Sequence, residues 1–295
     1  MFATRHNRAV LALVGAAFLF GATFVVVKSA LESIEPLGFI SWRFAIGAAL
    51  LATLAIPRGK RLWLHGSLAG LALFSGYALQ TLGLVDTTAT NSALITGLYV
   101  VFTPFLAATI SRRRPSPWVV AGAAAAFAGT ALLTGVERLS LGTGDLLTVG
   151  CAVGFAVHIV LLARYAHQHP VIPFATVQLA VTAVLSVVAS LAFESGPGIP
   201  ERSVWGAIAL TAVGVTVGAY LLQIWSQTVV GAGTAAVVLS AEPAFGLATA
   251  WVVLGERLTP GGWVGAGLIV AAIDVVVTKQ RDTASREAEA VTPAH

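Results

Sequence analysis

The stretch GAGTAAVVLSAEPAFGLATAWVVL, residues Gly231–Leu254, carries one ionisable side chain, Glu242, near its middle, followed directly by Pro243. About 20 consecutive, mostly apolar residues suffice to cross the hydrocarbon core of a bilayer as a helix. An ionised side chain near the centre of such a helix costs about 2.5 to 3.5 kcal/mol on insertion scales. The stretch therefore predicts a membrane-spanning helix in which a carboxylate has a specific use.

The rest of the chain follows the same pattern. Hydrophobic residues make up 57% of the 295 residues and charged residues only 10%, whereas soluble domains carry about 25% charged residues. So few charges cannot cover a soluble surface, and we expect an all-α polytopic membrane protein with ten transmembrane helices. The other nine predicted spans are Ala9–Ala30, Pro36–Ile56, Trp63–Leu84, Thr88–Ile110, Trp118–Gly135, Gly144–Ala163, Val171–Phe193, Val204–Trp225 and Gly261–Val277.

The Lys and Arg side chains predict the orientation, because they are enriched in cytoplasmic loops. With the N-terminus inside, twelve of the 17 Lys and Arg side chains are cytoplasmic and four are external, while Arg43 lies within the second span. The first apolar run is longer than the core of a typical signal peptide, so we interpret it as a membrane helix. We expect a multi-pass protein of the inner (plasma) membrane with both termini cytoplasmic. The polar cytoplasmic tail, residues 280–295, is expected to be disordered.

The two halves of the chain share short motifs in the same order. The matched positions are Gly15 with Gly150, Phe20 with Phe155, Tyr77 with Tyr220, Gln80 with Gln223, and Pro104 with Pro243. The repeat is five spans long, and an odd number of spans forces the second copy to enter the membrane in the opposite direction. We therefore predict two inverted five-helix repeats, residues 8–135 and 144–279, an arrangement that recurs in secondary transporters. The alternative is chance similarity between apolar segments.

Three motifs resemble a known family. They are FGATFVVVK at Phe20–Lys28, GDLL at Gly144–Leu147 and AEPAFGLATAWVVLGERLTPGGWVGAGLIV at Ala241–Val270. The chain resembles the EamA branch of the drug/metabolite transporter superfamily over nearly its whole length. The resemblance implies a ten-helix inner-membrane carrier, often an exporter of amino acids and related metabolites. It also implies a substrate cavity between the halves, lined mainly by helices one, three, four, six, eight and nine. One departure is SRRR at Ser111–Arg114, where the second half has GER at 255–257.

Polar groups within the spans are the candidate site residues. Glu242 either binds a ligand or proton, or fixes the kink at Pro243. Arg43 either snorkels, meets an anionic substrate group or pairs with a carboxylate, and His158 is either a proton relay or a packing residue. Paired Tyr and Gln side chains three residues apart share a helix face, which suits cavity lining or interhelical hydrogen bonding. The substrate-cavity candidates are Arg43, Tyr77, Gln80, Thr96, Tyr99, His158, Tyr220, Gln223 and Glu242, and the hinge candidates are Pro104 and Pro243.

These features favour a secondary transporter that works by alternating access and exports amino acids or related small metabolites. Proton exchange through Glu242 and facilitated diffusion are both open as coupling modes. No metal or cofactor site is expected, since the one cysteine, Cys151, lies in an apolar run. The expected partners are a metabolite and membrane lipid, with no nucleic acid, and a homodimer is compatible with the sequence. We expect no enzyme activity, because the ionisable groups are scattered singly. The alternatives are a non-transporting membrane scaffold and, less favoured, an intramembrane enzyme.

Overall fold

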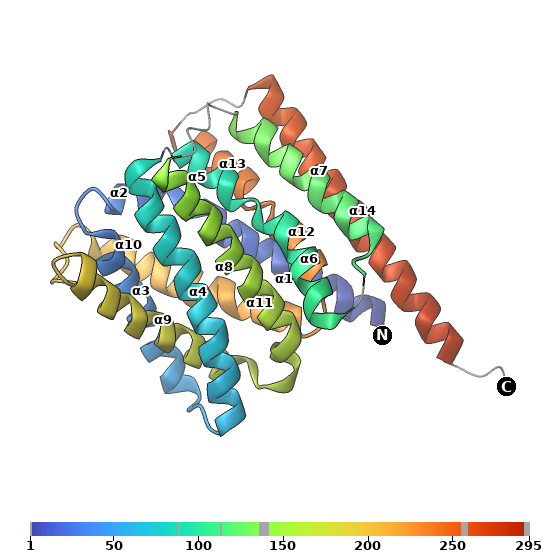
Figure 1. Cartoon of the computed structure of the whole chain (residues 1–295), viewed down its shortest axis with the longest axis horizontal. Helices are drawn as coiled ribbons and strands as arrows, with labels where there is room; N and C mark the ends of the chain where they lie inside the picture. The colour runs from blue at the N-terminus through green and yellow to red at the C-terminus, as the bar shows by residue number, and fades with distance from the viewer. Residues whose placement is uncertain (1, 88, 113, 136–141, 255–258, 292–295) are drawn as a thin grey trace.

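The structure is a computed structural model that describes residues 2–87, 89–112, 114–135, 142–254 and 259–291. Throughout these ranges the chain forms helices and no strand (Figure 1). The first half contains α1 (Phe2–Ala22), α2 (Phe24–Ala30), α3 (Pro36–Leu54), α4 (Lys60–Asp86), α5 (Ala89–Thr96), α6 (Tyr99–Ser111) and α7 (Pro117–Thr134). The second half contains α8 (Thr143–Tyr165), the 3-10 helix η1 (Ala166–Gln168), α9 (Val171–Phe193), α10 (Trp205–Leu210), the π-helix η2 (Thr211–Ala219), α11 (Tyr220–Gln227), α12 (Ala232–Leu239), α13 (Glu242–Leu254) and α14 (Pro260–Val291).

Eight helical segments of the described chain are long and apolar enough to cross a membrane. The prediction of an all-helical, multi-pass membrane protein is therefore confirmed, whereas the count of ten spans is not. The two remaining predicted spans are each divided into two helices. The first forms α1 and α2, and the ninth forms α12 and α13.

A hydroxyl-to-backbone hydrogen bond accompanies each division. The Thr23 hydroxyl donates to the Leu19 carbonyl at 2.9 Å, and such back-bonding bends helices. In the ninth predicted span, Ser240 donates to the Val237 carbonyl at 2.6 Å and ends α12. Pro243 then lies in the first turn of α13 rather than inside a continuous helix, a position where its missing N–H costs little. Pro104, in contrast, lies inside α6.

Residues 280–291 of the C-terminal tail differ from the expectation of disorder, because α14 continues through Val291, whereas residues 292–295 lie outside the described residues. Elongation of an existing helix avoids the cost of nucleation. The sequence beyond residue 280 is rich in Ala, Glu and Arg, which are strong helix formers. Polarity alone therefore does not end this helix where the apolar run ends.

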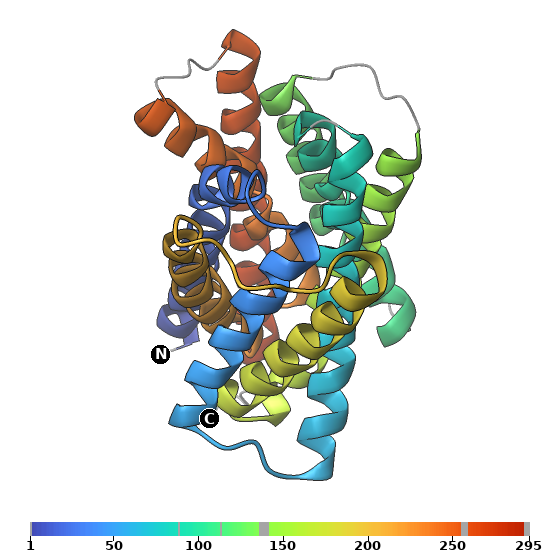
Figure 2. The ribbon, with the colours of Figure 1, turned by 90° about the vertical axis from the view of Figure 1, so that its left-hand side faces the viewer.

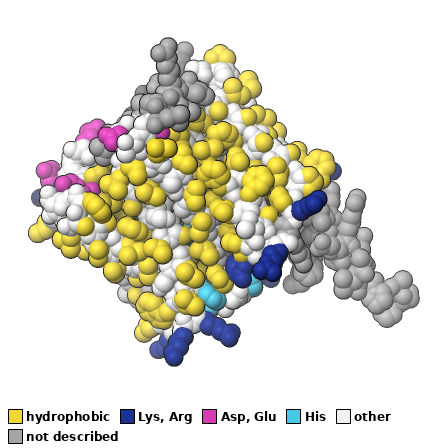
Figure 3. Space-filling view, in the orientation of Figure 1, with side chains coloured by type: hydrophobic (Ala, Val, Ile, Leu, Met, Phe, Trp, Pro, Cys, Tyr) yellow, Lys and Arg dark blue, Asp and Glu magenta, His cyan; other side chains and the backbone are white. Residues whose placement is uncertain are grey.

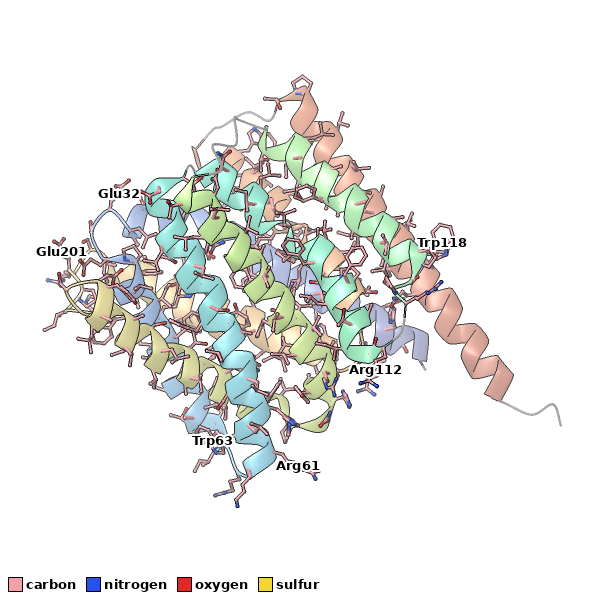
Figure 4. The ribbon with its side chains drawn as sticks, viewed as in Figure 1. Glu32, Arg61, Trp63, Arg112, Trp118 and Glu201 are labelled. Atoms are coloured by element: carbon pink, nitrogen blue, oxygen red, sulfur yellow. The ribbon has the colours of Figure 1, made fainter. Side chains whose placement is uncertain are left out.

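On the face seen in Figure 3, acidic side chains gather at one end and most Lys and Arg side chains at the opposite end, with many apolar side chains between them. Glu32 and Glu201 lie at one end, which we call the acidic end (Figure 4). Arg61 and Arg112 lie at the other, which we call the basic end, and Trp63 and Trp118 lie along the same side (Figure 4). Trp is enriched at membrane–water interfaces. The start of α1 and the end of α14 lie toward the basic end (Figure 1).

Helices of the two halves interleave rather than forming separate bodies. The second long helix of each half packs against its counterpart, α3 against α9, and the last helices, α7 and α14, do the same. Figure 2 shows α3 and α9 next to each other on the face toward the viewer. In addition, α4 of the first half packs along α8 of the second. The buried core is therefore built mainly between the halves.

The interface of α3 and α9 is fastened at the acidic end by hydrogen bonds to carboxylates. The backbone N–H groups of Leu37 and Gly38 donate to Glu194 at 2.8 and 3.0 Å. In return, the Ser195 N–H donates to Glu35 at 3.0 Å. A carboxylate at a helix N-terminus satisfies free N–H groups and complements the helix dipole. These bonds hold the start of α3 to the end of α9.

Close approach of α4 and α9 depends on Gly70. A Cβ at this position would lie 2.7 Å from the Gln178 carbonyl oxygen and 2.9 Å from the Val181 Cβ. Since transmembrane helices associate through van der Waals contact, small residues at such crossings allow tight packing.

Replacing Gly70 with Ala should therefore destabilise the protein, by about 1 to 3 kcal/mol as expected for overpacking. The measurement is the apparent melting temperature of the purified protein in detergent. Gly206→Ala is the matched control, because a Cβ on exposed Gly206 in α10 meets no atom within 4 Å. Equal melting temperatures for the two variants would contradict the close packing of α4 on α9.

At the basic end the halves meet through a histidine pair. His65 Nδ1 of α4 lies 2.9 Å from Nε2 of His169, between η1 and α9. The His65 ring stacks on Tyr165 with centroids 3.8 Å apart. Partial burial lowers the pKa of His169, and the charges of His65 and His167 lower it further. Arg61 and Arg164 add positive charge around His65.

Acidification should weaken this contact. Because the pKa of His169 is lower in the folded than in the unfolded protein, its contribution to stability is complete above the ordinary histidine pKa of about 6.5 and is lost as the pH falls. We expect the apparent melting temperature to drop between about pH 7.5 and about pH 5.5, with a smaller drop for His169→Gln. His167→Gln keeps the His65–His169 contact but removes one of the charges that act on His169, so it should reduce the drop less than His169→Gln does. An unchanged pH dependence in His169→Gln would rule out this contribution.

Candidate functional site

Two adjoining cavities lie between the halves. The larger has a volume of about 360 Å³ and the smaller about 80 Å³. Their linings share four residues, Phe20, Tyr77, Gln80 and Glu242. The larger cavity extends along α2, α3 and α4 toward the acidic end, where Leu31, Pro36, Leu84 and Thr87 line it. The smaller cavity lies deeper in the bundle, among α4, α5, α8 and α11.

Arg43 lies in the wall of the larger cavity and is 4% exposed. Its Nε–H donates to the Thr216 hydroxyl at 2.8 Å, and its Nη2 donates to the Tyr77 hydroxyl at 3.1 Å. The guanidinium carbon lies 5.0 Å from the Tyr77 ring centroid and 5.3 Å from that of Phe44, within cation–π range. Arg43 thus points into the bundle and does not snorkel to the interface.

Thr216 holds Arg43 from the π-helix η2. π-Helical turns are rare and occur frequently at functional sites. The matching helix of the first half, α4, is α-helical throughout. The two halves therefore differ in the helix that supports the charged group.

Glu242 is the first residue of α13, lines both cavities and is half-buried. Within the described ranges, no side chain or backbone group hydrogen-bonds to its carboxylate, and none forms an ion pair with it. Arg43 is near enough to act on the carboxylate electrostatically but does not contact it. A carboxylate without a partner in a membrane bundle is costly. The Glu242 carboxylate is therefore available to bind a group in the cavity.

The matched aromatic residues meet where the two cavities adjoin. The Tyr220 hydroxyl donates to the Tyr77 hydroxyl at 3.0 Å. Phe155 contacts Tyr77 edge to face at 5.3 Å, and Phe20 contacts Tyr220 in the same way at 5.2 Å. Exchanging the halves therefore maps one tyrosine–phenylalanine pair onto the other.

The matched glycines also make equivalent contacts in the two halves. A Cβ on Gly15 would lie 3.5 Å from Leu222 Cδ1, and a Cβ on Gly150 would lie 3.0 Å from Leu79 Cδ1. Leu79 and Leu222 each lie two residues after the matched tyrosines. The motifs that matched in the sequence thus make equivalent contacts in space.

The amide candidates are all engaged by neighbouring groups. Gln80 donates to the Thr96 hydroxyl at 3.1 Å, and Gln223 donates to Gln227 Oε1 at 3.2 Å. His158 Nε2 lies 2.9 Å from Gln178 Oε1. The first and third of these contacts join different helices and the second lies within α11, so hydrogen bonding and cavity lining occur together.

The structure brings the predicted site residues together. Arg43, Tyr77, Gln80 and Glu242 line the larger cavity. The smaller cavity is lined by all of the candidates other than Arg43, namely Tyr77, Gln80, Thr96, Tyr99, His158, Tyr220, Gln223 and Glu242. Their role as substrate contacts stays a prediction.

Sequence reasoning missed several members of the site. Phe20 and Phe155 were recognised as a matched pair but not as lining residues, although they line the smaller cavity. Thr216 and Gln178, the partners of Arg43 and His158, carry no motif. They are ordinary polar residues in apolar spans, and only the packing of distant helices identifies them.

The fold and cavities define a multi-pass membrane protein with an internal polar site between two related halves. The chain matches the EamA-like transporter family over residues 7–135 and 142–278, one match in each half. The chain therefore belongs to this family, as its motifs predicted.

Individual relatives support the assignment. An uncharacterized transporter of Archaeoglobus fulgidus is 34% identical over 260 residues, covering 88% of this chain and 82% of the relative. The aromatic amino acid exporter YddG of Ancylobacter novellus is 28% identical over 214 residues, covering 67% of this chain and 72% of that protein. A solved crystal structure superposes with a TM-score of 0.79 at 23% identity, covering 92% of this chain and 98% of the other, so the fold is shared.

Proposed function

We propose that the protein is a secondary transporter that exports amino acids or related small metabolites by alternating access. The observation that carries this proposal is the cavity between the halves, which extends from mid-bundle to the acidic end and has Arg43, Tyr77, Gln80 and Glu242 in an otherwise largely apolar lining. Ligand sites of transporters typically lie at the interface of two repeats. A non-transporting scaffold has no use for such a cavity, and the family is one of transporters.

Ten membrane passages in two inverted repeats fit the contacts best. In this arrangement α1 with α2 forms the first passage and α12 with α13 the ninth, since interrupted helices are common in transporters where they line a cavity. The equivalent tyrosine–phenylalanine contacts support a two-fold relation between the halves. With the basic end in the cytoplasm, both termini are cytoplasmic and the larger cavity faces outward.

The alignment of the two halves indicates where a cavity would form in the inward-open conformation. It pairs Thr23, Phe39 and Arg43 of the larger cavity with His158, Phe174 and Gln178 of the second half. These three counterparts are at most 2% exposed. If the halves exchange conformations, a second cavity opens between them toward the basic end. Gln227, the counterpart of Leu84, would then line its mouth.

The residues that line the two cavities support amino acids as the substrate class. Six Phe and Tyr rings and the amides of Gln80 and Gln223 are among the described residues that line the cavities, which suits a small molecule with an apolar side chain and polar backbone groups. The name of the Ancylobacter relative is consistent with this class.

The transport test uses purified protein in liposomes preloaded with unlabelled amino acids. We expect accumulation of at least one of the twenty radiolabelled amino acids by counterflow, because a carrier with a central site exchanges substrate across the membrane. Protein-free liposomes measure the leak. Absence of counterflow for amino acids and for a metabolite extract alike would overturn the transporter proposal.

Cysteine accessibility tests alternating access. In a Cys151→Ala background, Thr81→Cys in the larger cavity should react with an impermeant thiol reagent from outside. Its matched position, Ile224→Cys, is 1% exposed and should react from the cytoplasmic side, faster when substrate is present, since ligand shifts the population between states. If Ile224→Cys stays unreactive from the cytoplasmic side during exchange, the proposed second path does not exist.

A further inference from the structure

We propose that the site recognises its substrate as a zwitterion, with the substrate carboxylate on Arg43 and its ammonium group on Glu242. This inference rests on the proposed transport function and assigns roles to the two charged groups. Both side chains line the larger cavity, they come from different halves, and they are held apart without an ion pair.

Arg43 has donors to spare. A guanidinium carries five N–H groups, and described residues accept hydrogen bonds only from Nε and from Nη2, at Thr216 and Tyr77. The Nη1 amine has no acceptor within the described ranges. Thr216 and the two aromatic rings fix the plane of the group. A pre-oriented guanidinium with free donors is suited to a carboxylate.

Glu242 supplies the opposite half of the recognition. Its carboxylate has no hydrogen-bond donor within the described ranges and faces both cavities. An ammonium group has three donors and no acceptor, and a desolvated carboxylate is its natural partner. Neither Arg43 nor Glu242 can therefore satisfy its own charge with the protein groups described around it.

Net charge decides the ligand class. The pair is neutral together, so a zwitterion that bridges it adds no net charge and provides each group with a partner. A simple anion leaves Glu242 unpaired next to a second negative charge, and a simple cation does the same to Arg43. An uncompensated charge in a low-dielectric site is strongly unfavourable. The cavity volume of about 360 Å³ falls within the usual size range of small-molecule sites.

The two charges could instead pair directly with each other in the opposite state and never touch substrate. That alternative makes a different prediction. Loss of either charge then slows every substrate equally, whatever charge the substrate carries.

The experiment compares three compounds with one side chain. They are the amino acid that gives the fastest counterflow, its amide, which lacks the carboxylate, and its deaminated acid, which lacks the ammonium group. Initial rates of exchange are measured in liposomes containing wild type, Arg43→Gln or Glu242→Gln. We expect the wild type to prefer the amino acid at least about tenfold over both analogues.

The variants should lose this preference in opposite ways. Arg43→Gln should lose about tenfold or more of its rate with the amino acid while retaining the amide, because a charge-assisted hydrogen bond disappears. Glu242→Gln should retain the deaminated acid instead. Arg43→Lys and Glu242→Asp keep the charges and should keep the order of preference. Arg202→Gln and Glu201→Gln, exposed residues outside the cavities, control for loss of charge.

Two outcomes would overturn the inference. One is equal slowing of all three compounds in both charge-removing variants that still purify as folded protein. The other is exchange of a metabolite class without zwitterions when no amino acid exchanges. In the second case the transporter proposal stands and only the zwitterion assignment fails.

Discussion

The cost of placing an unpaired charge in hydrocarbon governs the whole molecule. Charges that need no internal role collect at the acidic and basic ends, and an apolar surface separates them. Arg43 is tolerated inside because a hydroxyl from η2, a tyrosine hydroxyl and two aromatic faces surround it. Glu242 is tolerated because it faces a polar cavity at a helix N-terminus, where the helix dipole favours negative charge.

The second determinant is the relation between the halves. Tyr77 and Tyr220 hydrogen-bond to each other, and each carries a phenylalanine from the matched helix of the other half. These aromatic contacts are equivalent in the two halves, but the charged cavity residues of one half have no charged counterpart in the other. Arg43 corresponds to Gln178, which binds His158 instead of a tyrosine. The aromatic centre is thus shared by both halves, while the chemistry around it is not.

Much of this arrangement could be predicted from the sequence. Apolar runs, charge distribution and motif order led to a membrane bundle and to nine cavity candidates, all of which line one or other cavity. The breaks at Thr23 and at Ser240 could not be predicted, because other Ser and Thr residues, such as Thr130 and Thr148, bond back to the helix in the same way without interrupting it. The π-helix η2 and the pairing of Arg43 with Thr216 depend on tertiary packing, which overrides local preference. The C-terminal part of α14 illustrates that a polar segment rich in good helix formers can extend a helix that begins in an apolar segment.

The asymmetry of the halves has a consequence for a carrier of the proposed kind. If the two halves were chemically identical, exchanging their conformations would return the same site to the opposite side. Here the guanidinium belongs to α3, its hydroxyl partner to η2 and the carboxylate to α13. Movement of one half against the other therefore changes the separation of the two charges. A ligand that bridges them binds the two states with different strength, and that difference in binding free energy is what shifts the population between them.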